Sequence, residues 1–163
     1  MVKAAMPLGA IGRRCFMALR AVLLAFFLSL IVPIGHGALA EQRVDVEAVA
    51  MKEGFGRLVL TFEGRLTLPG YNAEVNNGVL VVKLDEPIAA GVDRVTLSLG
   101  EYITVARADP NDKALRFALA RAVRVNTMEA GEKLFIDLLP YDWTGLPPGL
   151  PEEVVAELAR RAQ

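Results

Sequence analysis

Apolar and polar residues alternate along most of the chain after residue 41, in short segments separated by glycine, proline, asparagine and aspartate. Alternation with a period of two places successive side chains on opposite faces of a β-strand. Short segments of this kind, recurring about every eight to twelve residues, are typical of an all-β sandwich or barrel. We therefore expect an antiparallel β-sandwich of about eight or nine short strands.

The individual segments predict which strands are half buried and which are central. Apolar residues alternate with polar ones at 44–50, and at 57–63 Leu58, Leu60 and Phe62 share one face. Both patterns indicate a strand with one face on the core and one in water. The run 79–82 is continuously apolar, so we expect a central strand that is buried on both faces.

Turn residues between the segments predict hairpins. Asn76-Asn77-Gly78 separates 71–75 from 79–84, and Asn-Gly between two extended runs favours a tight hairpin because both central residues tolerate positive φ. The sequence Asp109-Pro110-Asn111-Asp112 predicts a turn before the alternating Leu115, Phe117 and Leu119.

Two more hairpins follow from the same reasoning. We expect 92–99 and 102–108 to pair around Gly100, and a turn at 129–132 to precede a last strand at 134–138.

The first forty residues have a different pattern. Lys3, Arg13, Arg14 and Arg20 are their only charges, an apolar run covers 21–32, and Ala38-Leu39-Ala40 precedes Glu41. A basic start, a short apolar run and small residues before a cleavage point are the parts of a secretory signal peptide. We expect residues 1–40 to be removed after Ala40, which places the remaining protein in the periplasm. An uncleaved membrane anchor is the alternative, although the apolar run is shorter than the ~20 residues that a span needs. The pair Arg13-Arg14 leaves the twin-arginine route open beside the general secretory route.

The C-terminal end is also distinct from the strand region. Residues 140–151 are rich in proline and glycine and contain Trp143, which predicts an extended, semi-rigid segment. Residues 152–163 predict a helix, with Pro151 before it and two glutamates in its first turn. A helix this short is marginal alone. It therefore either packs back on the sandwich or opens a longer helical region.

Composition narrows the range of partners. The whole chain carries a net charge of −1 and residues 1–40 carry +4, which leaves −5 for residues 41–163. This acidity disfavours nucleic acid and anionic lipid as partners, because both need clustered lysine and arginine. Membrane contact is therefore expected only through the signal peptide before cleavage.

Residues that commonly carry catalysis are scarce after residue 40. The only histidine, His36, and the only cysteine, Cys15, both lie in the predicted signal peptide. Nucleophilic triads and the usual zinc, copper and iron ligands are therefore missing from residues 41–163. Cys15 also does not follow the cleavage point, as the acylated cysteine of a lipoprotein would. The sequence predicts no cofactor, no metal and no enzymatic activity.

Carboxylates are the remaining candidates for chemistry. Asp85, Glu86, Asp137 and Asp142 are the acids that a carboxylate-only hydrolase would use, and such an enzyme requires them to converge in a cleft. Asp109, Asn111 and Asp112 have part of a calcium-loop composition, but the remaining ligand positions are missing, so a turn is the better interpretation.

Binding residues are expected among aromatic and arginine side chains on the faces of the strands, because these types carry most of the binding energy at protein surfaces. Strand edges are the other expected surface, since an open edge can pair with an extended partner. The candidate side chains are Tyr71, Tyr102, Arg107, Arg116, Arg121, Arg124 and Trp143. The alternative interpretation is that the tyrosines belong to the core, that the arginines solvate a face, and that Trp143 covers one end of the core.

The order of these strands resembles the AMIN domain, a periplasmic β-sandwich found in exported amidases and secretin subunits. The resemblance covers about residues 44–139 and is assigned to the domain 41–139. It depends on strand patterns rather than invariant chemistry. The segments that carry it are Arg57-Leu58-Val59-Leu60-Thr61-Phe62, Tyr71-Asn72-Ala73-Glu74-Val75, Gly78-Val79-Leu80-Val81-Val82-Lys83-Leu84, Gly100-Glu101-Tyr102-Ile103-Thr104-Val105-Ala106-Arg107 and Gly131-Glu132-Lys133-Leu134-Phe135-Ile136-Asp137-Leu138.

The resemblance implies a non-catalytic module that localises a larger protein by binding peptidoglycan or a periplasmic protein. It supplies no site residues, and the segments 140–151 and 152–163 lie outside it. The alternatives left open are an assembly domain that acts through its edge strands or terminal helix, and a carboxylate-only hydrolase. The oligomeric state is not predicted.

Overall fold

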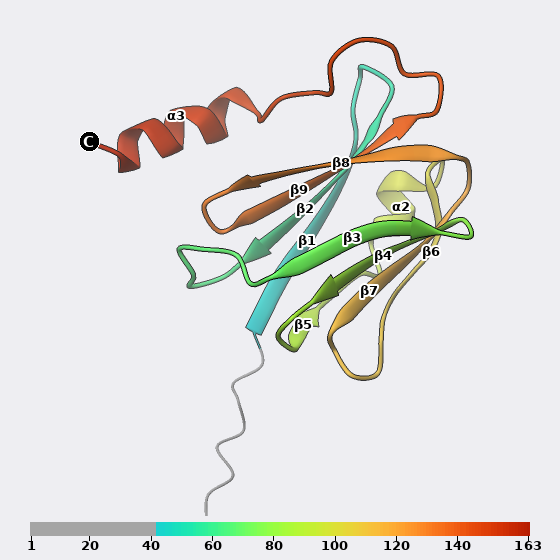
Figure 1. The fold of residues 1–163 in the computed structure, drawn as a ribbon, viewed down its shortest axis with the longest axis horizontal. Helices are drawn as coiled ribbons and strands as arrows, with labels where there is room; N and C mark the ends of the chain where they lie inside the picture. Colours follow the sequence, from blue (N-terminus) through green and yellow to red (C-terminus); the bar gives the residue numbers. More distant parts are fainter. Residues whose placement is uncertain (1–41) are drawn as a thin grey trace, which may run out of the picture. The chain divides into compact units, whose positions relative to one another are not determined.

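A computed structural model describes residues 42–163, so the predicted signal peptide, residues 1–40, lies outside the described residues. Within this range nine strands form two sheets (Figure 1). The five-stranded sheet has the order β5-β1-β2-β9-β8, with strands β1 (Gln42–Ala50), β2 (Gly56–Phe62), β5 (Ile88–Ala90), β8 (Val123–Ala130) and β9 (Lys133–Pro140). The four-stranded sheet has the order β3-β4-β7-β6, with strands β3 (Tyr71–Asn76), β4 (Val79–Leu84), β6 (Ile103–Ala108) and β7 (Ala114–Leu119).

The core lies between the two sheets and comes from the alternating positions of both. Leu58 and Ile136 from the five-stranded sheet and Leu80 and Phe117 from the four-stranded sheet are fully buried in one hydrophobic cluster. Each side chain of this kind stabilises the fold by about 1.5–3 kcal/mol through burial. The predicted β-sandwich is thus confirmed.

Three of the predicted hairpins are present. Asn77 and Gly78 have φ values of 50° and 76°, which lets β3 and β4 pair over their full length. The turn 109–112 joins β6 to β7, and Gly131, with φ of 57°, joins β8 to β9. Strand β4 lies between β3 and β7, and Leu80, Val81 and Val82 are all buried, as the apolar run predicted.

The predicted pairing of 92–99 with 102–108 is wrong. Residues Val95–Leu99 form the short helix α2, in which Val95 and Leu99 are 1% exposed and Leu97 is 84% exposed. An alternating strand would have placed all three side chains on one face. In a helix, residues four apart, such as Val95 and Leu99, share a face, and Leu97 midway between them points away from it. Five residues of this pattern fit both periodicities, and contact with the core favours the helix.

One strand pairing has no local signal in the sequence. Strand β5 pairs with β1 in parallel, and only through three register pairs that end at Val44 opposite Ala90. The chain turns away at Gly91 and leads into α2. The rest of β1, from Asp45 to Ala50, pairs with β2 alone among the described residues.

The C-terminal helix packs back on the sandwich, one of the two arrangements that the sequence left open. Helix α3 (Glu152–Arg161) places Val154 and Leu158 against Val59, Ala130 and Phe135, on the face of the five-stranded sheet that points away from the main core. Its start at Pro151 and its two N-terminal glutamates agree with the prediction.

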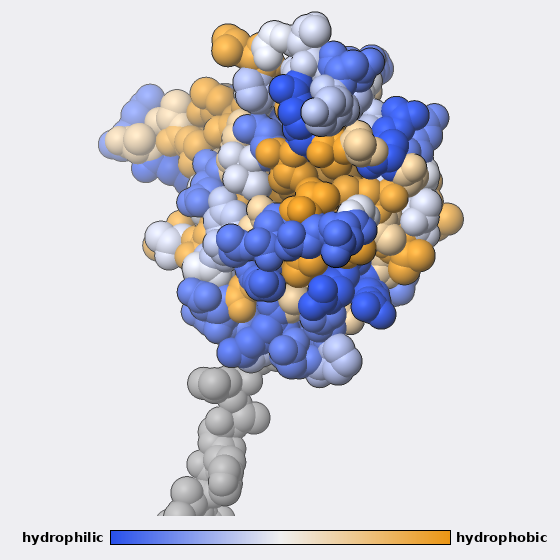
Figure 2. Space-filling model, turned by 45° about the vertical axis from the view of Figure 1, so that its right-hand side comes forward, coloured by the Kyte–Doolittle hydropathy of each residue, from blue (hydrophilic) through white to orange (hydrophobic). Residues whose placement is uncertain are grey.

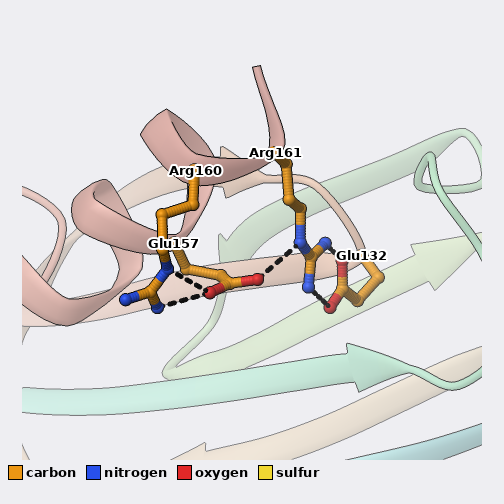
Figure 3. A network of polar contacts seen from close by, with 4 residues as sticks. All are labelled: Glu132, Glu157, Arg160 and Arg161. Carbon is orange, nitrogen blue, oxygen red and sulfur yellow. Dashed lines mark hydrogen bonds and ion pairs between the residues drawn. The ribbon is translucent and has the colours of Figure 1, made fainter. Parts of the chain in front are cut away.

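A group of ion pairs holds the end of α3 against the β8–β9 hairpin (Figure 3). Arg161 donates to Glu132 at 2.8 and 3.2 Å and to Glu157 at 3.0 Å, while Arg160 also donates to Glu157. The hydrogen bonds from Arg161 lower the pKa of the Glu132 carboxyl, and the backbone N–H of Glu132 lowers it further. The helix is therefore anchored by apolar contacts at one side and by charge at its end.

Part of the surface is apolar. On the face drawn in Figure 2, hydrophobic residues gather between hydrophilic groups above and a hydrophilic band below. Folded proteins commonly leave apolar atoms at the surface, so such exposure assigns no function by itself. Among residues 42–163 no helix combines the length and hydropathy required to cross a membrane.

Candidate binding surface

A buried ion pair lies on the outer face of the five-stranded sheet. Arg57 and Asp137 are directly opposite each other on β2 and β9. The guanidinium donates two hydrogen bonds to the carboxylate, at 2.6 and 2.9 Å, and the side chains are 5% and 0% exposed. Two charges removed from water in this way must neutralise each other, because either one alone would carry a large desolvation cost.

Aromatic rings surround this ion pair. The guanidinium of Arg57 lies 5.3 Å from the ring centroid of Phe55 and 5.6 Å from that of Phe135. The ring of Phe55 in turn meets Trp143 edge to face, with centroids 5.6 Å apart. Edge-to-face pairs of this kind add to the energy of burial. A continuous cluster of cation and aromatic side chains therefore joins the sheet to the segment 140–151.

Hydrogen bonds fix the course of that segment over the sheet. Arg57 donates a third bond, 3.0 Å long, to the carbonyl of Gly149, and Arg124 on β8 donates to the carbonyl of Trp143. The indole N–H of Trp143 donates to the carbonyl of Leu146 at 3.3 Å. The proline-rich segment is thus held at several points and does not run freely.

A hollow remains between this segment and the sheet. Its volume is about 360 Å³, and it is lined by the rings of Phe55 and Trp143, by Arg57, and by Glu53 and Glu152 at its rim. Because Asp137 neutralises Arg57, the uncompensated charges beside the hollow are those of the two glutamates. The hollow therefore offers the half-buried ring of Trp143 together with two exposed carboxylates. We call it the Trp143 hollow.

Of the predicted binding residues, Trp143 lines this hollow. Arg124 does not line it but donates to the carbonyl of Trp143, and the others lie elsewhere. Tyr102 is 4% exposed, and its hydroxyl donates to the carbonyl of Gly54 at 2.8 Å. Arg121 lies over the ring of Tyr102, 5.6 Å from its centroid. Burial raises the pKa of the Tyr102 hydroxyl. This tyrosine is part of the core, in agreement with the alternative interpretation.

The arginines of the four-stranded sheet form a separate group on its outer face. Arg116 donates to Asp109 at 2.7 and 2.8 Å, and Arg107 lies opposite Arg116 in the register of β6 and β7. The hydrogen bonds from Arg116 lower the pKa of Asp109. Asp109 also begins the turn in which the side chain of Asn111 accepts from the backbone N–H of Lys113. The segment 109–112 is a turn, as the sequence indicated.

Tyr71 lies near β8, where that strand approaches β3. Its pKa is raised, chiefly by burial, and its hydroxyl interacts with Thr127 and Glu129. The tyrosine is half-buried, with its ring packed against the main core. Tyr71 does not line the Trp143 hollow. It connects β3 and β8, which are edge strands of the two sheets.

Two of the four candidate carboxylates have ion-pair partners of their own. Asp137 is paired with Arg57, and Glu86 is paired with Arg65 beyond the end of β4. Asp85 donates its backbone N–H to Gly70 at 2.9 Å. Asp142 is exposed. In residues 42–163 no three acidic, histidine or cysteine side chains come together in a way that would hold a metal ion.

Phe55 and Arg57 are functional candidates that the sequence did not single out. Arg57 is the one charged residue in β2. Asp137 is likewise the one charged residue in the apolar stretch that follows Lys133 in β9. A charge inside each of two apolar strands is a signal for a buried pair. The register that makes them partners across 80 residues is visible only in the structure.

The fold and this surface define a β-sandwich with a C-terminal segment folded over one sheet. No protein-family model matches the chain, and a search of curated proteins gives no match. Among solved structures the chain is similar to heat shock protein 16.0 from Schizosaccharomyces pombe, with a TM-score of 0.35 and 10% identity over 82% of this chain and 92% of that chain. A likeness at this level carries no argument about function. The resemblance to the AMIN domain stays a prediction.

Proposed function

We propose that this protein is an exported, non-catalytic binding module of the cell envelope, and that it contacts peptidoglycan through the Trp143 hollow. The observation that carries the proposal is a concave surface of about 360 Å³ lined by the half-buried Trp143, whose ring packs edge to face on the buried Phe55. Concave sites with aromatic walls and few polar groups are the usual form of a ligand site.

The chemistry of the hollow fits the proposed ligand. Sugar rings have apolar C–H faces that pack on an indole ring, and the peptide stems of peptidoglycan carry free amino groups. An amino group is attracted by the carboxylates of Glu53 and Glu152 at the rim. The ion pair of Arg57 with Asp137 holds the floor of the hollow in place and leaves no free charge there.

A sacculus pull-down with residues 41–163 tests the proposal. We expect retention above that of an unrelated exported protein, and a loss of about tenfold in affinity for Trp143→Ala, equivalent to about 1.4 kcal/mol. Tyr141→Ala is the matched control, because Tyr141 is two residues away, is 77% exposed and does not line the hollow. Equal retention of the two variants would remove the hollow from the proposal. Retention no higher than that of the unrelated protein would remove peptidoglycan.

Export through a signal peptide cleaved after Ala40 is part of the same proposal. Its support is the charge and hydropathy pattern of residues 1–40. N-terminal sequencing of the protein recovered from a periplasmic extract should begin at Glu41. A start at Met1 would favour the uncleaved anchor instead.

The second candidate function is assembly with a periplasmic protein through a strand edge. It is favoured by a specific observation, the unpaired part of β1 after β5 ends.

A further inference from the structure

Strand β1 is an edge strand of the five-stranded sheet over most of its length, because β5 covers only its start. Its ladder with β5 ends at Val44, whereas its ladder with β2 continues to Ala50. Beyond Ala90 the chain turns at Gly91, so in the described part of the chain no strand lies beside residues 45–50 on the side away from β2. An unpaired strand edge presents backbone donors and acceptors that can pair with another chain.

The backbone groups that face this open edge can be identified. The N–H of Glu63 on the β2 side donates to the carbonyl of Arg43 at 3.3 Å, so Arg43 directs its backbone groups toward β2. Successive residues of a strand direct these groups to opposite sides. Arg43, Asp45 and Glu47 therefore bond toward β2, while Val46 and Ala48 direct their N–H and C=O groups to the open edge.

The open edge faces a hollow that lies between β1 and helix α2, which also contacts β1. A hollow of about 700 Å³ is lined by residues 45–49 of β1 on one side and by Arg94 and Ser98, which belong to the start and body of α2, on the other. A strand added to a sheet lies about 4.8 Å from its neighbour. Because residues 45–49 of β1 line the hollow, a strand added to the open edge would enter it. We call it the β1 slot.

The charge of the β1 slot selects the kind of occupant. Asp45, Glu47 and Asp93 contribute three carboxylates, and Arg94 contributes one guanidinium. None of these four groups has an ion-pair partner within residues 42–163. An extended segment with lysine or arginine would bring opposite charge to this edge, while an acidic segment would be repelled.

We infer that the β1 slot is a docking site for an extended, basic segment of a partner protein, which adds a strand to the five-stranded sheet beside Val46 and Ala48. Main-chain hydrogen bonds supply affinity in this mode, and the carboxylates supply the preference for a basic sequence. The inference rests on the second candidate function, assembly through a strand edge, and specifies its partner. It is independent of the Trp143 hollow, because it depends on the backbone of β1 and on none of the aromatic residues.

The probe is a short synthetic peptide of alternating lysine and valine with a fluorescent label, and residues 41–163 are the protein. Fluorescence anisotropy should show saturable binding, and hydrogen exchange of the Val46 and Ala48 amides should slow on adding the peptide. The same peptide with glutamate in place of lysine should bind at least roughly tenfold more weakly. Equal binding of both peptides, or no slowing at these two amides, would overturn the inference.

Two variants test the slot from different sides. Ala48→Pro removes an outward N–H and leaves the bonds toward β2 in place, and proline is tolerated at an open edge. We expect it to weaken peptide binding roughly tenfold. The combined variant Asp45→Asn, Glu47→Gln and Asp93→Asn keeps the backbone and should weaken binding by a similar factor. Glu101→Gln is the matched control, because Glu101 is exposed and does not line the slot.

The two variants also keep the test decisive. If Ala48→Pro fails to fold, as judged by circular dichroism, the charge variant alone decides, and unchanged binding by it overturns the inference. Sedimentation without peptide measures the oligomeric state and tests whether a second copy of this chain occupies the slot instead. A dimer that the Ala48→Pro variant turns into a monomer would assign the slot to a second copy of this chain and would overturn the partner proposal.

Discussion

Removing one partner of the Arg57–Asp137 ion pair should destabilise the fold far more than removing a surface charge. Asp137→Ala leaves a guanidinium that is 5% exposed with the carbonyl of Gly149 as its remaining hydrogen-bond acceptor. Breaking a buried pair in this way costs about 3–5 kcal/mol. A small domain is stable by about 5–15 kcal/mol, so the loss is a large part of the total.

The double substitution separates the pair from its surroundings. Replacing both groups by apolar residues, Arg57→Met with Asp137→Leu, removes the uncompensated charge along with its partner. Such replacements are often neutral or stabilising. We therefore expect the double variant to be more stable than either single variant, with a coupling energy of about 3 kcal/mol in the double-mutant cycle. Glu74→Gln is the control, because its pair with Lys83 is exposed and contributes about 0–1 kcal/mol.

Urea unfolding of residues 41–163 measures these differences. Trp143 is the only tryptophan and lies beside the pair through Phe55, so its fluorescence reports the region directly. With an m-value of about 1–3 kcal/mol per molar urea, the midpoint of Asp137→Ala should fall by more than roughly 1 M. The reasoning would be refuted if Asp137→Ala cost no more than Glu74→Gln, or if the losses of the two single variants simply added in the double variant.

Two further predictions concern helix α3. Leu158→Ala should lower the helical signal in circular dichroism while the sheet persists, because Leu158 packs on the sheet and a helix of this length is marginal alone. Val155→Ala is the control, because Val155 is exposed, and it should leave the helical signal unchanged. Acid should also loosen α3. Arg161 lowers the pKa of Glu132 in the folded protein. The ion pair therefore contributes fully to stability above the ordinary glutamate pKa of about 4.3, and this contribution is lost as the pH falls through the lowered pKa. A pH titration of helical signal should show a smaller acid loss for Glu132→Gln than for the wild type, and identical curves would contradict this.

The sequence predicted those parts of the fold that local chemistry determines. Asn77 and Gly78 tolerate the positive φ that a tight hairpin requires, so the β3–β4 hairpin could be predicted from three adjacent residues. The segment 95–99 was misread as a strand because five residues satisfy both a period of two and a period near four. The parallel contact of β5 with β1 joins residues far apart in the chain and has no turn to announce it.

The candidate site was predicted in its residue types but not in its arrangement. Trp143 and Arg124 were expected to bind, and the structure brings them together through one hydrogen bond. Tyr102 had the same pattern as a surface tyrosine, yet the carbonyl of Gly54 satisfies its hydroxyl in the interior. Which alternating residues face water depends on the layers that cover each sheet. The outer face of the five-stranded sheet is covered by Leu150 and α3, which no strand pattern can indicate.

The two proposed surfaces lie on the same sheet but use different chemistry, so each can fail alone. The Trp143 hollow depends on side chains of the segment 140–151, and Trp143→Ala should leave the backbone of β1 and its peptide binding intact. The β1 slot depends on backbone groups at Val46 and Ala48, and Ala48→Pro should leave sacculus retention intact. Testing each variant in both assays therefore shows whether the protein joins the wall to a partner, binds the wall alone, or works as an assembly domain. A loss of both activities in either variant would mean that the sheet, and not a particular site, had been disrupted.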